Sequence, residues 1–317
     1  MAAPARLPAD ASARPPAAAA WQPAILEEVR VETLQSSAFV LQIRRRHDRE
    51  LGSDLSALAG RSGGSAPFFE PAFLNASWHR FPGREKRLMV LLEEQGEARD
   101  ARLAFPFAEQ RLGFPPRCAW RAFSHPFAPL SLPLMEADGD TAAGFAAALA
   151  RLSAPMPLVF QDFPAEEPQA RALAAALQAA GFALARAEPV RRGVLLPSAD
   201  IERGMGRKRV KEHARQLRRL AEMGTVTWEI AEDFRDVLLR FEEFLLLETR
   251  SWKGRRGTSI HVIRSTAAFA RQAVAAMAKN GAAAMLSLPL DGRAIASVVL
   301  PPSSGRSYPR KIPFHAD

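Results

Sequence analysis

The chain has 317 residues, of which 48% are hydrophobic, and a formal net charge of +9. This length and composition are sufficient for two globular domains with apolar cores. No apolar run approaches the roughly 18 residues of a transmembrane helix. A single cysteine, Cys118, excludes an internal disulfide framework and fits a reducing compartment. We therefore expect a cytoplasmic protein without a membrane span.

The N-terminal part divides into a tail and a first α/β domain. Residues 1–24 are rich in alanine and proline and lack the apolar core of a signal peptide, so we expect a disordered tail. Residues 25–197 form the expected N-terminal domain. Its patterns predict, in chain order, a strand in Glu28–Gln35, the end of a helix in Asp54–Ala59, a helix in Ala72–Arg80, a hairpin of Arg87–Glu93 with Ala101–Phe107, and a strand, helix and strand in Pro155–Phe163, Ala165–Ala180 and Phe182–Leu196.

The remaining residues, 198–317, form the expected C-terminal domain, which again places a helix before a hairpin. Apolar residues at helical spacing predict a basic helix that ends at Leu220, a helix that starts after Asp233, and a helix over Thr266–Lys279. A strand is expected over Thr225–Ile230. The dipeptide Asp291-Gly292, between Ala283–Leu290 and Ala294–Leu300, predicts a β-hairpin. Both halves of the chain thus place a helix before a hairpin, and this shared order favours two tandem α/β units.

Much of the positive charge is concentrated in one segment. Residues Arg203 to Arg219 contain eight lysines or arginines and one acid, Glu212. The apolar residues of this helix are expected to form a buried face: Val210, Ala214, Leu217 and Ala221. The cations either form a solvated surface or bind phosphate groups, with Arg207, Lys208, Arg215 and Arg218 as the candidates. The segment has no aromatic residue on which a nucleic-acid base could stack.

A second cationic segment follows the helix after Asp233, in the sequence SWKGRRGT. Gly254 and Gly257 are expected to release the backbone from the helix. One interpretation is an ordinary helix C-terminus. The other is a substrate loop, in which Trp252 forms a flat wall and Lys253, Arg255 or Arg256 binds an anion. Glu248, at the end of the helix, either acts as a general base or pairs with an arginine.

Other classes of site lack support in the sequence. The six histidines and Cys118 show no metal-ligand spacing, so no metal site is predicted. The chain has no nucleophile elbow, P-loop or dinucleotide fingerprint, which argues against hydrolases, kinases and dehydrogenases.

Three stretches of the C-terminal half carry a resemblance to a known family: Gly206–Ile230, Phe241–Ile260 and Leu286–Leu300. They resemble the GNAT-type N-acetyltransferase domain of bacterial CelD-like proteins, which are named for cellulose biosynthesis and are related to Fem-type tandem acyltransferases. The stretch Phe68–Trp78 and the hairpin after it fit more loosely. The resemblance implies two tandem GNAT-like units with mixed, largely antiparallel sheets.

The resemblance also implies a function and a limit to it. The expected activity is transfer of an acyl group, usually acetyl, from acyl-CoA to the amine of a small molecule or saccharide, with a link to polysaccharide or cell-envelope metabolism. In the family, the pyrophosphate-binding turn follows a strand that matches Ser307–Phe314, and this chain ends at Asp317. The resemblance therefore predicts a C-terminally truncated domain whose activity is in question. The alternatives are an anion- or nucleic-acid-binding protein that uses residues 203–219, and a Fem-type aminoacyl-tRNA-dependent transferase.

Overall fold

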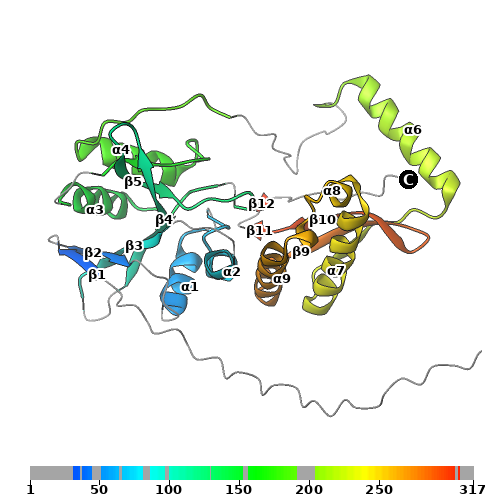
Figure 1. The fold of residues 1–317 in the computed structure, drawn as a ribbon, viewed down its shortest axis with the longest axis horizontal. Coiled ribbons are helices and arrows are strands. Elements are labelled where there is room, and N and C mark those ends of the chain that lie inside the picture. Colours follow the sequence, from blue (N-terminus) through cyan, green and yellow to red (C-terminus); the bar gives the residue numbers. More distant parts are fainter. Residues whose placement is uncertain are drawn as a thin grey trace, which may run out of the picture.

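The computed structural model describes residues 31–35, 38–44, 51–63, 66–80, 86–96, 100–128, 130–152, 156–190, 204–303 and 306–307 (Figure 1). The predicted tail, residues 1–24, and the predicted strand Ser307–Phe314, apart from its first residue, lie outside these ranges. Within them, the fold is a mixed α/β arrangement with mostly antiparallel sheets, as the sequence predicts. No helix in the described ranges is long and apolar enough to cross a bilayer.

The larger sheet belongs to the N-terminal half and has the strand order β1-β2-β3-β4-β5-β7, with β6 paired to β4. Every pairing is antiparallel except that of β5 with β7. The strands are β1 (Val31–Gln35), β2 (Phe39–Arg44), β3 (Arg87–Glu94), β4 (Ala101–Leu112), β5 (Arg117–Ala122), β6 (Leu134–Met135) and β7 (Leu158–Val159).

The central hairpin of this sheet, β3 with β4, confirms the predicted hairpin. Six consecutive residues of β3, Leu88 to Glu93, are buried, so both faces of the strand are covered. The helices of this half are α1 (Leu51–Arg61), α2 (Pro71–Arg80), α3 (Gly139–Ala150) and α4 (Pro168–Ala179). Helices α1 and α3 both contact the sheet.

The predicted strand–helix–strand unit over Pro155–Leu196 is wrong in part. Its first strand is reduced to β7. Pro157, the residue before β7, cannot donate a backbone hydrogen bond, but its carbonyl oxygen accepts one from the N–H of Trp120. Residues 182–190 form no strand and are mostly exposed, and no strand of the described ranges pairs with them. Residues 191–196 are outside the described ranges. The parallel strands β5 and β7 are instead connected through α3.

The smaller sheet belongs to the C-terminal half and has the order β10-β9-β8, all antiparallel. Its strands are β8 (Glu229–Ala231), β9 (Ala284–Leu290) and β10 (Arg293–Leu300), and a short pair, β11 (Pro302–Ser303) with β12 (Arg306–Ser307), follows. The helices are α6 (Arg207–Met223), α7 (Phe234–Arg250), α8 (Trp252–Arg255), the 3₁₀ helix η1 (Ile260–Val262) and α9 (Arg264–Lys279). The predicted β9–β10 hairpin is confirmed, and Asp291 and Gly292 both have positive φ, of 49° and 76°.

The two halves meet where α2 packs against α9 (Figure 1). Phe269 of α9 enters an aromatic cluster of the N-terminal half. Its ring centroid lies 5.6 Å from that of Phe73, 5.4 Å from His125 and 5.6 Å from Phe127. Buried residues from both halves therefore belong to one continuous hydrophobic core. The boundary between residues 197 and 198, and the tandem arrangement of two GNAT-like units, stay predictions.

Candidate functional site

The cationic turn after α7 is a compact, hydrogen-bonded structure. Asp233 caps the start of helix α7, and its carboxylate accepts a hydrogen bond from the backbone N–H of Arg235 at 2.9 Å, as its position predicts. The helix ends at Ser251, which is buried. The Ser251 hydroxyl donates to the carbonyl oxygen of Glu248 at 2.7 Å and accepts from the backbone N–H of Lys253 at 3.2 Å. One serine therefore ends α7 and caps the start of α8.

Glycine is required at the two positions of the turn, Gly254 and Gly257, for different structural reasons. Gly257 has φ of 67°, a conformation that favours glycine, as predicted. Gly254 does not leave the helical conformation, contrary to the prediction, because it lies inside α8. A Cβ atom at this position would lie 1.6 Å from the carbonyl oxygen of Thr249. Gly254 is therefore required for the close packing of α8 on the end of α7.

Glu248 lies inside the protein with no exposed surface. Its Oε2 accepts a hydrogen bond of 2.7 Å from the backbone N–H of Ile260, the first residue of η1. Its Oε1 lies 3.6 Å from Nζ of Lys253, whose side chain is 16% exposed. These contacts tie the end of α7 to both α8 and η1. A general base must reach the proton that it removes, so the catalytic role of Glu248 stays a prediction that requires the turn to open.

The outer side of the turn presents an aromatic ring and cations to solvent. The guanidinium carbon of Arg256 lies 5.3 Å from the ring centroid of Trp252, within the range of a cation–π contact. Trp252 is 40% exposed, and Arg255 and Arg256 are also exposed. Three of the four predicted substrate-binding residues, Trp252, Arg255 and Arg256, therefore face the solvent. The fourth, Lys253, faces Glu248. Their binding role stays a prediction.

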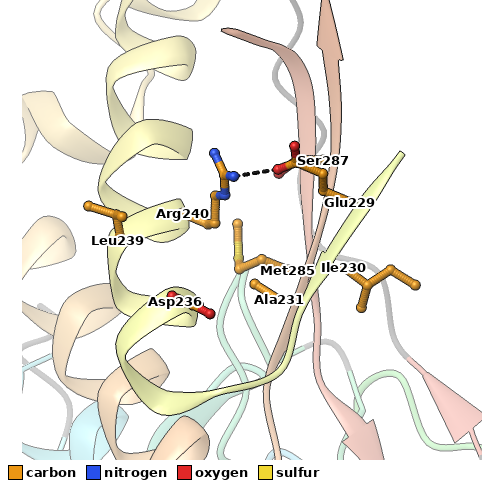
Figure 2. Close-up of a pocket in the computed structure, with 8 residues that line it drawn as sticks. All are labelled: Glu229, Ile230, Ala231, Asp236, Leu239, Arg240, Met285 and Ser287. Carbon is orange, nitrogen blue, oxygen red and sulfur yellow. Dashed lines mark hydrogen bonds and ion pairs between the residues drawn. The ribbon is translucent and has the colours of Figure 1, made fainter. Parts of the chain in front are cut away.

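A hollow of about 290 Å³, which the sequence did not indicate, lies between α7 and the smaller sheet (Figure 2). Arg240 of α7 reaches across it and forms ion pairs with Glu229 of β8 and with Glu243 at 2.9 Å. The hydrogen bond that Arg240 donates to the Glu243 carboxylate raises the pKa of Arg240, and the charges of Glu229 and Asp236 add to this effect. The other lining residues are Ile230, Ala231, Leu239, Met285 and Ser287.

The chemistry of this hollow is mixed. The carboxylates of Glu229 and Asp236 favour a cationic ligand, while Arg240 already neutralises part of their charge. The sequence gives only a weak signal for this hollow. Arg240 and Glu243 are three residues apart on one helix, and such i,i+3 ion pairs are common on helices that line no site. Only the packing of α7 on the sheet brings Glu229 to them.

The predicted anion-binding residues lie on α6, which stands apart from α7 and α8 in Figure 1. Arg207, Lys208, Arg215 and Arg218 are all exposed. Arg215 forms two hydrogen bonds to Glu212, of 2.8 and 2.6 Å, and these lower the pKa of the Glu212 carboxyl. The prediction that α6 buries an apolar face is wrong, because none of its residues is buried. The structure does not bring α6 and the cationic turn into one site.

No group of histidine, cysteine, aspartate or glutamate side chains suited to a metal ion occurs in the part of the chain that the structure describes.

Comparison with known proteins gives one match, to part of the chain. Residues 207–317 match the family model described as an acetyltransferase (GNAT) domain, from the first residue of α6 onward. The larger sheet lies outside the match. No curated protein sequence matches the chain. The match supports membership of residues 207–317 in the GNAT acetyltransferase superfamily.

Proposed function

We propose that this chain is an acyl-CoA-dependent N-acyltransferase of the GNAT type, with acetyl as the transferred group. The observation that carries the proposal is the GNAT match over residues 207–317. The described part of that region supports it with the order helix α7, short helix α8, helix α9 and hairpin β9–β10. The proposed acceptor is an amine on a small molecule or saccharide.

In the proposed reaction the acceptor nitrogen attacks the thioester carbonyl carbon. A C–N bond forms, the C–S bond breaks, the coenzyme leaves as its thiol, and a base takes the proton from the amine. The exposed surface of Trp252, Arg255 and Arg256 offers a flat apolar face beside two cations. Coenzyme A carries several phosphate charges, and guanidinium groups bind phosphate through paired hydrogen bonds. We therefore propose this surface as a contact for the coenzyme.

The proposal is tested by titrating acetyl-CoA into the full chain in a calorimeter, and by measuring thiol release with a panel of small amines and amino sugars. Binding together with amine-dependent thiol release is the expected result. Replacing both Arg255 and Arg256 with alanine should weaken binding about 100-fold or more, since charge-assisted hydrogen bonds contribute roughly 1.5–3 kcal/mol each. The matched control replaces Arg111 and Arg117, which are exposed at the far sheet. Absence of acetyl-CoA binding would overturn the proposal.

The role of Glu248 needs a variant that keeps the turn intact. In the double variant Glu248→Gln, Lys253→Met, the amide oxygen can still accept from Ile260, and no buried charge remains at this pair. If Glu248 is the base, this variant should bind acetyl-CoA normally and lose at least 100-fold in the rate of thiol release. An unchanged rate would assign Glu248 a structural role alone.

A further inference from the structure

None of the residues that the structure describes buries the apolar face of α6. We define it as Val210, Ala214, Leu217, Leu220 and Ala221. None of these residues is buried, and Leu217 is 48% exposed. The side chains recur at three- and four-residue spacing, so they form one continuous stripe along the helix. A contiguous stripe of apolar side chains in water indicates a surface that a partner covers.

The cations of α6 are segregated beside this stripe. At about 100° per residue, six of them fall within an arc of about 120°. This basic face consists of Arg207, Lys208, Lys211, Arg215, Arg218 and Arg219, with Glu222 in the same arc and Glu212 at its border. The stripe, together with His213, fills a neighbouring arc, and Arg209 borders its other side. An apolar stripe with cations on both borders is the pattern of a helix that lies in the interface of an anionic membrane.

The fold presents this helix at one end of the molecule. Helix α6 lies apart from both sheets (Figure 1). Its C-terminal end is held by Thr225, whose backbone N–H donates to the Asp291 carboxylate at 2.8 Å and whose carbonyl oxygen accepts from the Asp291 N–H at 2.9 Å. Met223 and Trp228, on either side of this attachment, are 66% and 64% exposed. Tryptophan is enriched at membrane interfaces because its ring is apolar and its N–H is polar.

We propose that α6 attaches the protein peripherally to an anionic lipid surface. The basic face would pair with the lipid headgroups, and the apolar stripe would insert at the boundary between the headgroups and the acyl chains. Nucleic acid would satisfy only the cations, and α6 has no aromatic residue for base stacking. A second copy of α6 would satisfy only the stripe and would bring two strongly positive helices together. This proposal is independent of the acyltransferase proposal.

The test is co-sedimentation of the full chain with vesicles of phosphatidylglycerol and phosphatidylcholine, compared with vesicles of phosphatidylcholine alone. We expect binding to the anionic vesicles only. The triple variant Arg215→Ala, Arg218→Ala, Arg219→Ala should bind about 100-fold more weakly, since each cation near the surface contributes about fivefold. The control triple variant, Arg111→Ala, Arg117→Ala, Arg186→Ala, removes the same charge from exposed positions elsewhere and should bind normally.

A second variant separates lipid from other polyanions. The change of Val210 and Leu217 to serine leaves the charge unaltered and should reduce vesicle binding about tenfold, because two apolar side chains no longer enter the interface. Circular dichroism would check that both variants keep their helix content. Absence of binding to anionic vesicles at low salt would overturn the proposal. An equal loss of vesicle binding in the control triple variant would also overturn it. So would binding to duplex DNA that is tighter than vesicle binding and that the serine changes do not affect.

Discussion

Single residues in the cationic turn hold α7, α8 and η1 together. Ser251 makes hydrogen bonds in two directions, and Glu248 contacts both Lys253 and the N–H of Ile260. The sequence grouped Lys253 with Trp252, Arg255 and Arg256 as candidate substrate-binding residues. In the structure, Lys253 turns inward, while Trp252, Arg255 and Arg256 remain outside. The difference arises because a buried carboxylate is far more stable with a cation beside it.

At this scale we predict that Gly254→Ala lowers the free energy of unfolding by about 3 kcal/mol or more. The new Cβ would lie 1.6 Å from the backbone oxygen of Thr249, which cannot move without distorting α7. The control is Gly60→Ala, at an exposed position of α1 with no atom within 4 Å of the new Cβ. That change should stabilise by about 0.5–1 kcal/mol. Urea unfolding of the two variants measures both effects, and similar stabilities would contradict the packing of α8 on α7.

We also predict energetic coupling between Glu248 and Lys253. Lys253→Met removes the ammonium group 3.6 Å from a buried carboxylate and should destabilise by about 2–3 kcal/mol. Adding Glu248→Gln removes the charge as well, so the double variant should be more stable than the sum of the single changes by at least about 1 kcal/mol. A double-mutant cycle of unfolding free energies measures this coupling. Additive effects would show that the two side chains do not interact.

An ion pair between residues far apart in the sequence connects helices α7 and α9. Arg271 of α9 donates to Glu242 of α7 through Nε at 2.6 Å and Nη2 at 2.8 Å. These hydrogen bonds lower the pKa of the Glu242 carboxyl and raise the pKa of Arg271. Both side chains are more than a third exposed, so the pair contributes about 0.5 kcal/mol.

The sign of the pH dependence follows from the lowered pKa of Glu242. Its stabilising effect is present at neutral pH, above the unfolded-state pKa, and is lost as the pH falls through the lower pKa of the folded state. Arg271→Met should therefore destabilise by about 0.5 kcal/mol at pH 7 and by nothing measurable in strong acid. Thermal unfolding of both proteins across this pH range gives the comparison. A difference that persists or grows in acid would rule out this ion pair as its cause.

At the scale of the whole molecule, the contact between α2 and α9 joins the two halves into one core. Phe269 is 1% exposed and is surrounded by Phe73, His125 and Phe127. Phe269→Ala should lower the free energy of unfolding by about 3–5 kcal/mol. The control, Phe234→Ala, changes a side chain that is 41% exposed and should cost less than about 1 kcal/mol. Equal effects in thermal unfolding would contradict a shared core.

The sequence by itself determined the elements whose signals are local. The β3–β4 hairpin, the Asp291-Gly292 turn of β9–β10, the Asp233 cap and the apolar face of α7 all depend on residues within a few positions of each other. Only the tertiary structure decided where α6 lies, that residues 182–190 do not form a strand, and that Lys253 faces Glu248. Helical spacing shows that a helix has an apolar face, but burial requires a partner surface, and only the folded chain reveals which faces have one.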